Sequence, residues 1–350
     1  MRTCSIFKVG SVLAIVMIGF GLALVAVLRT YITDLPNTDP YLRVEFVTPS
    51  TGFIVGSRLL QTTDGGKTWK IVRRGGDGTF RSPGVVESLH RFQFINQEVG
   101  VTRGRDFLRR TSDGGQSWPE TYSMPMDREH RPPSFFFISP KKGWVAGANV
   151  YSTEDGGQNW ERLAATPTGD EYQQPLLWFN TSKDGLVVTL DGMVQLTNDG
   201  GRTWQYVFDA GQQLTNVFFT DSSNGWIVGF DGYVARTQDG GRTWKYIRTP
   251  TSAGLFSVHF INPNSGCAVG TKCTIICTKD GGVTWNFASV KSLPDMAPIL
   301  ASVSFANELN GWAVGGFGYQ HSFDFSWLPS KIALTTKDGG QTWEPVDLPH

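Results

Sequence analysis

The sequence predicts an all-β protein: a seven-bladed β-propeller of four-stranded antiparallel blades, preceded by one N-terminal transmembrane helix. Three observations predict this architecture. A box of the form Asp-Gly-Gly-x-(Thr/Ser/Asn)-Trp occurs seven times, an aromatic residue stands six positions before a glycine in phase with every box, and an uncharged apolar run precedes the first repeat. Repeats of about 40 to 50 residues are typical of four-stranded propeller blades.

The composition agrees with a folded protein rich in aromatic side chains. The 350 residues include 41 Gly, 12 Trp and 23 Phe, and only 18% are charged. A disordered chain or a coiled coil would carry more charge and fewer aromatics. The net charge is zero, so we expect no nucleic-acid partner. Four cysteines are too few for a scaffold built on disulfides.

The first element is a membrane segment. Residues 9–28 (VGSVLAIVMIGFGLALVAVL) form an uncharged run of 20 positions, about the length of a helix that crosses a ~30 Å hydrocarbon core. Arg2 and Lys8 precede this run and only Arg29 follows it closely, which favours a cytoplasmic N-terminus. A cleaved secretory signal peptide is the alternative, although its apolar region is usually shorter.

This orientation defines the expected organisation of the chain. We expect a cytoplasmic N-terminus at residues 1–8, a transmembrane anchor at 9–28, a linker at 29–40 and the propeller at 41–350. The protein would then be a single-pass membrane protein. Its propeller would lie on the periplasmic or lumenal side.

The seven boxes follow one another at nearly regular intervals, which average about 46 residues. They pair Asp64 with Trp69, Asp113 with Trp118, Asp155 with Trp160, Asp199 with Trp204, Asp239 with Trp244, Asp280 with Trp285 and Asp338 with Trp343.

The second motif, the aromatic–glycine pair, keeps its spacing of six in every repeat. The pairs are Phe46/Gly52, Phe94/Gly100, Phe137/Gly143, Phe179/Gly185, Phe219/Gly225, Phe260/Gly266 and Phe305/Gly311. Short β-branched or aromatic runs flank each glycine, a third run precedes each box, and the box tryptophan begins a fourth. Each repeat therefore predicts a meander of four strands.

The residues of the box suit a tight turn between the third and fourth strands. Gly-Gly permits positive φ, the Asp carboxylate accepts N–H groups of the turn, and the Trp offers a large apolar surface for packing. Ligands for calcium or sugar are the alternative role of the seven carboxylates. Because the boxes are spread around a ring and do not converge, we interpret them as structural and expect no metal and no cofactor.

Loop lengths distinguish the two ends of the propeller. The turns between strands one and two and between strands three and four have constant lengths and emerge at one end of each blade. The other loops vary, the largest being residues 72–91 and 316–328. Function concentrates on variable loops held by a rigid scaffold, so we expect the working surface opposite the boxes.

Arginines gather in two of these variable regions. The stretch after the first box holds Arg73, Arg74, Arg81 and Arg91, and the region between strands two and three of the second repeat holds Arg103, Arg105, Arg109 and Arg110. Arginine suits bidentate binding of carboxylate or phosphate. Solvated arginines paired with nearby acids, such as Asp77, Glu87 and Asp106, are the alternative.

Signatures of catalysis are mostly absent from the sequence. The five histidines show no metal-ligand spacing, and no P-loop, HExxH or GxSxG occurs. Three cysteines fall in the sixth repeat. We expect Cys267 to oppose Thr278 and Cys277 to oppose Ala268, which leaves the thiols on opposite faces and disfavours a disulfide. Cys267 is then a small apolar core residue.

The in-phase boxes and the strands Gly225–Gly229 (GWIVG) and Gly311–Gly315 (GWAVG) resemble the photosystem II stability/assembly factor family over residues 41–349. This resemblance implies a non-enzymatic lumenal or periplasmic propeller that assists assembly of a membrane protein complex. The implied partner is a membrane protein or a subunit of that complex, the photosystem II reaction-centre protein in a photosynthetic source. An arginine patch is associated with this role. Its candidates here, from loop position, are Arg73, Arg74, Arg81, Arg91, Arg103 and Arg105.

Other proteins with Asp boxes fit less well. Sialidases would call for six blades and an Arg-Ile-Pro element, which does not occur here, and xyloglucanases need two propellers. A glycan-active hydrolase of the sialidase-like type and a receptor-like extracellular binding domain nevertheless stay as alternative functions. The apolar segment at residues 9–28 also differs from the lipoprotein signal or transit peptide that is typical of the family.

Overall fold

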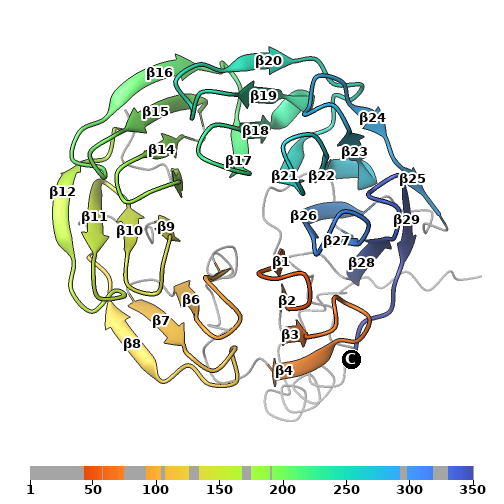
Figure 1. The fold of residues 1–350 in the computed structure, drawn as a ribbon, viewed down its shortest axis with the longest axis horizontal. Coiled ribbons are helices and arrows are strands. Elements are labelled where there is room, and N and C mark those ends of the chain that lie inside the picture. The colour runs from red at the N-terminus through yellow and green to blue at the C-terminus, as the bar shows by residue number, and fades with distance from the viewer. Residues whose placement is uncertain are drawn as a thin grey trace, which may run out of the picture. The chain divides into compact units, whose positions relative to one another are not determined.

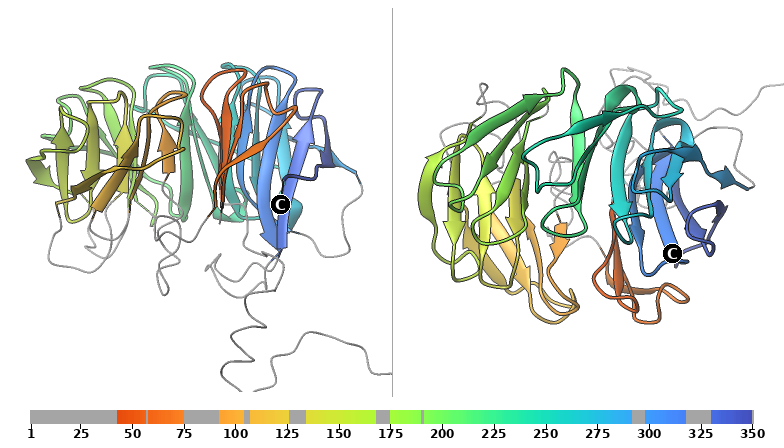
Figure 2. Two further views of the ribbon diagram at one scale, coloured as in Figure 1. Left: turned by 90° about the horizontal axis from the view of Figure 1, so that it is seen from below. Right: turned by 45° about the horizontal axis from the view of Figure 1, so that its top comes forward.

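The computed structural model describes residues 43–56, 58–74, 92–103, 107–125, 134–167, 175–189, 191–291, 298–317 and 330–349. These residues belong to one compact unit, Asp39–His350. Within it, seven antiparallel sheets stand around a central axis like the blades of a propeller (Figure 1). Seen from the side, the strands run between the two ends of the ring (Figure 2).

In blades one to six the four strands follow one another in sequence order from the axis outward. Blade one contains β1 (Arg43–Phe46), β2 (Gly52–Val55), β3 (Arg58–Thr62) and β4 (Lys70–Arg74). Blade two contains β5 (Phe92–Phe94), β6 (Gly100–Arg103), β7 (Phe107–Thr111) and β8 (Glu120–Ser123). Blade three contains β9 (Ser134–Phe137), β10 (Gly143–Ala146), β11 (Asn149–Thr153) and β12 (Glu161–Ala165). Blade four contains β13 (Leu176–Phe179), β14 (Gly185–Val188), β15 (Met193–Thr197) and β16 (Gln205–Asp209).

The last three blades follow the same plan with one addition. Blade five contains β17 (Leu214–Phe219), β18 (Gly225–Gly229), β19 (Val234–Thr237) and β20 (Lys245–Ile247). Blade six contains β21 (Leu255–Phe260), β22 (Gly266–Gly270), β23 (Ile275–Thr278) and β24 (Asn286–Phe287). Blade seven contains β26 (Ile299–Phe305), β27 (Gly311–Phe317), β28 (Ser330–Thr336) and β29 (Thr342–Pro345), and β25 (Ser289–Val290) pairs parallel with β29 as a fifth strand. Two 3-10 turns, η2 (Phe230–Gly232) and η3 (Thr271–Cys273), join strands two and three of blades five and six.

The aromatic–glycine motif sets the register at the inner edge of every blade. Phe46 is the cross-strand partner of Gly52, and the other six pairs match in the same way. The Phe ring lies directly over its glycine: a Cβ on Gly143 would come within 2.4 Å of the Phe137 ring. Glycine is needed at this position because any side chain would displace the ring.

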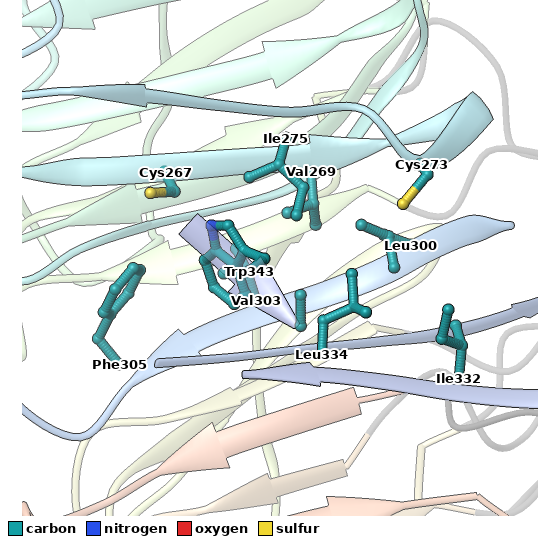
Figure 3. Close-up of a cluster of buried hydrophobic side chains, with 11 residues drawn as sticks. Cys267, Val269, Cys273, Ile275, Leu300, Val303, Phe305, Ile332, Leu334 and Trp343 are labelled. Carbon is teal, nitrogen blue, oxygen red and sulfur yellow. The ribbon is translucent and has the colours of Figure 1, made fainter. Parts of the chain in front are cut away.

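The hydrophobic core is divided among the interfaces between blades. Seven clusters of buried side chains each join two neighbouring blades, and each holds residues of the β-branched or aromatic runs noted in the sequence. Between blades six and seven, Trp343 is fully buried among Val269, Leu300 and Leu334 (Figure 3). Stacked rings recur between neighbours, as in Trp144 on Phe179, with ring centroids 3.7 Å apart.

The ring closes between blades seven and one without sharing a strand. The hydroxyl of Ser304 accepts a hydrogen bond from the backbone N–H of Phe46 at 3.0 Å, and that of Ser302 accepts one from the N–H of Val44 at 3.2 Å. The Trp312 ring packs against the Phe46 ring, 4.7 Å between centroids. Among the described residues, contacts that involve side chains therefore join the first blade to the last.

The predicted transmembrane helix at residues 9–28 lies outside the described residues, as do the N-terminal segment and the linker. In the part of the chain that the structure describes, no helix has the length and apolar character needed to cross a membrane.

Candidate functional site

The end of the propeller that carries the boxes is a set of seven closed hydrogen-bonded turns. In blade one, the Asp64 carboxylate accepts hydrogen bonds from the Thr68 N–H at 2.9 Å and the Thr68 hydroxyl at 2.6 Å. It also accepts one from the hydroxyl of Thr62 at 2.8 Å, and that hydroxyl accepts the N–H of Gly66. Gly65 and Gly66 both have positive φ. The hydrogen bonds to the box carboxylate are therefore supplied by residues of the same turn.

The threonine two positions before the box aspartate is a residue that the sequence analysis missed. It is buried in every blade and donates its hydroxyl proton to the box carboxylate at 2.7–2.8 Å. The recurrence of this threonine at the same position in all seven repeats could have revealed its role. The seven residues are Thr62, Thr111, Thr153, Thr197, Thr237, Thr278 and Thr336.

These hydrogen bonds stabilise the charged form of the box carboxylates. The hydroxyl of Thr68, followed by its N–H group, lowers the pKa of Asp64 to about 2. The N–H of Asn159, followed by its side-chain amide, lowers the pKa of Asp155 to about 2. A carboxylate that accepts these hydrogen bonds from its own turn stabilises the turn. Among the described residues, no group of three His, Cys, Asp or Glu side chains could hold a metal ion.

Each box is also bound to the turn between strands one and two of its own blade. The N–H of Gly65 donates to the carbonyl of Ser50 at 2.8 Å, and an equivalent bond occurs in all seven blades. The two turns of constant length therefore lie at the same end, as the sequence predicts. The described connections between strands two and three, among them η2 and η3, lie at the opposite end.

Of the six arginines predicted to form a patch, the structure describes Arg73, Arg74 and Arg103. Arg73 and Arg74 lie in β4, and Arg74 pairs across the sheet with Arg58 of β3. Arg81, Arg91 and Arg105 lie outside the described residues.

Arg103 was predicted to lie in an exposed loop, but it lies in a strand. It is the last residue of β6, and its side chain is only 2% exposed. Arg109 and Arg110 likewise lie on β7 and not in a loop. The guanidinium of Arg110 donates to the carbonyl of Pro140 at 2.7 Å and lies 3.7 Å from the Glu120 carboxylate. Arg110 therefore joins blades two and three.

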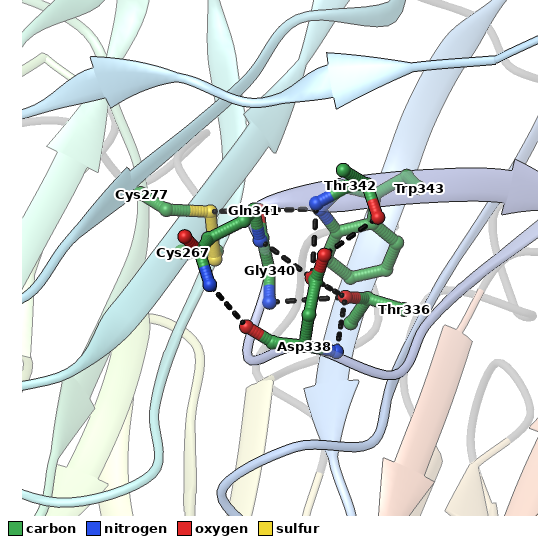
Figure 4. The surroundings of a disulfide bond; sticks show 8 residues. All are labelled: Cys267, Cys277, Thr336, Asp338, Gly340, Gln341, Thr342 and Trp343. Carbon is green, nitrogen blue, oxygen red and sulfur yellow. Dashed lines mark hydrogen bonds between the residues drawn. A yellow bond between two sulfur atoms is a disulfide. The ribbon is translucent and has the colours of Figure 1, made fainter.

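The prediction about the cysteines of blade six is wrong. Cys267 pairs directly with Cys277 across β22 and β23, and the two form a disulfide (Figure 4). The turn η3 centres the hairpin on Lys272, with positive φ at Lys272 and Cys273, which shifts the register by one residue from the expected pairing. The Cys277 sulfur lies 3.3 Å from the carbonyl of Gly340 in the blade-seven box.

The innermost strands contain a single acidic residue in the part of the chain described, Glu45 of β1. Burial raises the pKa of this carboxyl, although the nearby Arg43 guanidinium opposes the shift. Its Oε2 atom lies 3.4 Å from Nε of Arg43 and accepts the N–H of Phe94 in blade two. Glu45 therefore bridges the first two blades.

Comparison with protein families gives one match that covers more than half of the chain. The model of the family described as "Photosynthesis system II assembly factor YCF48" matches residues 26–125 and 243–350. The chain belongs to the YCF48 family. No curated protein matches it.

Solved structures share the propeller fold. A structure titled "YCF48 bound to D1 peptide" is 21% identical, with 87% of this chain and 95% of that chain covered and a TM-score of 0.61. YCF48 from Cyanidioschyzon merolae is 18% identical over 81% and 95% of the two chains, with a TM-score of 0.60. The GH74 enzyme of Niastella koreensis is 14% identical over 88% and 59%, with a TM-score of 0.53. At these identities the likeness concerns the fold alone.

Proposed function

We propose that this protein is a membrane-anchored, non-enzymatic binding propeller that assists assembly or stability of a membrane protein complex. Its membership of the YCF48 family and the solved YCF48 whose title names a bound D1 peptide support a membrane-protein partner. One observation supports a binding role above all: the box carboxylates accept hydrogen bonds from their own turns. The repeats then form a scaffold, and the variable loops are free to recognise a partner.

The arginines of blades one and two are the proposed contact with that partner. Arg73 and Arg74 lie in β4, and the sequence places Arg81 and Arg91 between β4 and β5 and Arg105 between β6 and β7. Arginine guanidinium groups bind carboxylates in bidentate geometry, so a partner segment with carboxylates would suit them. Arg103 is buried at the end of β6, so its proposed role is to position the loop that follows.

The proposed location is the non-cytoplasmic side of the membrane, with residues 9–28 as the anchor. The disulfide between Cys267 and Cys277 supports this side, because disulfides form and persist in oxidising compartments. A photosystem II reaction-centre protein is the partner we propose for a photosynthetic source.

Affinity purification from membranes tests the arginine contact. The Arg81→Gln/Arg105→Gln variant should recover at least ~10-fold less of the co-purifying membrane protein, because each lost charge-assisted hydrogen bond weakens binding. The matched control is Arg202→Gln/Arg242→Gln, which removes the same charge from exposed positions at the box end. Identical partners and yields for both variants would rule out the arginine contact.

Glycan hydrolysis is disfavoured by the shortage of carboxylates near the axis. Glycosidases generally use two carboxyl groups about 5 to 10 Å apart, and the innermost strands as described supply only Glu45. A screen with fluorogenic glycosides checks this directly. Turnover that disappears in the Glu45→Gln variant would identify a hydrolase instead of a binding protein.

A further inference from the structure

Blade five has a hollow on its outer side that is lined by cationic side chains. The hollow measures about 480 Å³ and lies along β20, between that strand and the box turn of blade six. Arg236, Lys245 and Arg248 line it, together with the ring of Tyr246, which is 57% exposed, and Val283. This hollow is separate from the arginine loops of blades one and two.

The seven repeats provide an internal comparison for this site. In each blade, one residue of the third strand pairs with the residue that follows the box tryptophan, or in blade two, where Pro119 intervenes, with the second residue after it. In blade two this pair is Arg110 with Glu120, an ion pair at 3.7 Å. In blade five it is Arg236 with Lys245, two cations directly opposite one another. The other five pairs are Gln61/Lys70, Ser152/Glu161, Leu196/Gln205, Cys277/Asn286 and Thr335/Glu344.

No carboxylate of the described residues neutralises this pair. Asp239 lines the same hollow, but its oxygens accept the Thr243 N–H, the Thr243 hydroxyl and the Thr237 hydroxyl within the box. The Arg236 guanidinium lies over the Trp226 ring at 5.8 Å, and its Nε atom is buried without a hydrogen-bond partner. A like-charge pair that is partly desolvated costs stability unless an anion occupies the site.

The outer edge of the blade suits an extended peptide. β20 is the last strand of its sheet, with a neighbour on one side only in the described part of the chain. Blade seven shows how such an edge accepts a further strand. There β25 pairs with β29, with the N–H of Ser289 bonded to the carbonyl of Gln341 and the N–H of Lys291 bonded to the carbonyl of Trp343. Trp244 holds the equivalent position in blade five and lines the hollow.

We propose that the outer side of blade five binds an acidic, extended peptide segment of a partner protein. The segment adds to the edge of β20 as β25 adds to β29. A carboxylate of the segment lies between the Arg236 guanidinium and the Lys245 ammonium, with Arg248 beside them. The exposed Tyr246 ring provides an apolar contact for a neighbouring side chain. Main-chain pairing gives affinity in this mode and the side-chain contacts give specificity.

Fluorescence anisotropy with the full chain in detergent tests the proposal. The probe is a labelled (Thr-Glu)5 peptide, with (Thr-Gln)5 as the neutral reference, at 0.15 M salt where the Debye length is about 8 Å. We expect the acidic peptide to bind, the neutral peptide to bind at least ~10-fold more weakly, and the Arg236→Gln/Lys245→Gln variant to lose the difference. The matched control Lys67→Gln/Lys70→Gln removes two exposed charges from the equivalent edge of blade one and should bind as the unaltered protein does.

The Lys245→Glu variant provides a second readout that separates binding from folding. It recreates in blade five the Arg110–Glu120 arrangement of blade two. We expect it to abolish peptide binding while raising the Tm by about 1–2 °C, because repulsion becomes attraction. A protein damaged in folding would instead melt earlier.

Three outcomes would overturn the proposal. The first is equal affinity for the acidic peptide in the unaltered protein and in Arg236→Gln/Lys245→Gln. The second is binding of inorganic phosphate alone with the same affinity, which indicates an unspecific anion site. The third is binding of phosphatidylglycerol vesicles but not of the peptide through these residues, which indicates a lipid surface. None of these results bears on the arginine loops of blades one and two, which affinity purification tests separately.

Discussion

At the scale of single residues, the threonine and aspartate of each box act as one unit. The Thr62 hydroxyl donates to Asp64 and accepts the Gly66 N–H, so it links the carboxylate to the backbone of the turn. This unit gives the box aspartate a structural role, which explains why it recurs seven times although we interpret it as no ligand-binding residue. The hydrogen bonds that the carboxylate accepts are strongest while it is ionised.

The acid stability of the protein should therefore depend on the boxes. The pKa of Asp155 is about 2 in the folded protein, below the usual value of about 3.9 in an unfolded chain. Its contribution is present above pH ~4 and is lost as the pH falls through ~2. The Asp155→Asn variant should melt below the unaltered protein at pH 5–7, and the difference should shrink between pH 4 and pH 2. A constant difference in Tm across this range would contradict the assignment; Asp347→Asn, at an exposed carboxylate, is the control.

The box tryptophans should contribute to stability in proportion to their burial. Trp343 is fully buried and donates its indole N–H to the carbonyl of Gly340 at 3.0 Å. Trp343→Ala should lower the free energy of unfolding by ~3–5 kcal/mol, measured by chemical denaturation. Trp160 is only partly buried and its indole nitrogen has no hydrogen-bond partner, so Trp160→Ala should cost less. Equal losses, or an unchanged stability of Trp343→Ala, would refute the packing role.

At the scale of single elements, strand positions followed from the sequence because each motif fixes a register. The spacing of six between Phe46 and Gly52 is the length of a hairpin whose ring covers the glycine. The hairpin of blade six was predicted one residue out of register. Its turn places Lys272 and Cys273 at positive φ, which these residue types rarely adopt and which the sequence does not signal. Strand β25 was missed because its two residues carry no periodicity.

Removal of the blade-six disulfide should destabilise that blade. Cys267 and Cys277 close a loop with a sequence separation of 10, for which the loss of the cross-link costs about 2–3 kcal/mol. Adding reductant should therefore lower the Tm of the unaltered protein. The Cys267→Ala/Cys277→Ala variant should melt at the lower temperature with or without reductant. A reductant effect that survives in this variant would assign the sensitivity to another group, such as the buried thiol of Cys273.

At the scale of the whole molecule, the repeats made the propeller predictable, whereas the candidate site was predictable only as a region. Loop lengths identified the variable end, because the box turns are bound to the first hairpins in all seven blades. The individual arginines were harder to place. Arg103 and Arg110 belong to strands, and which side chain becomes buried between blades depends on the neighbouring blade and not on the local sequence. The cation pair of blade five required the cross-strand register.

The closure of the ring through side chains has a consequence for where the polypeptide can begin. Blade seven meets blade one through Ser302, Ser304 and Trp312, and none of the described strands crosses this boundary. Every boundary between blades is then a possible starting point for the polypeptide. A gene with its repeats rotated should therefore encode the same blades, because each described sheet is complete within one repeat.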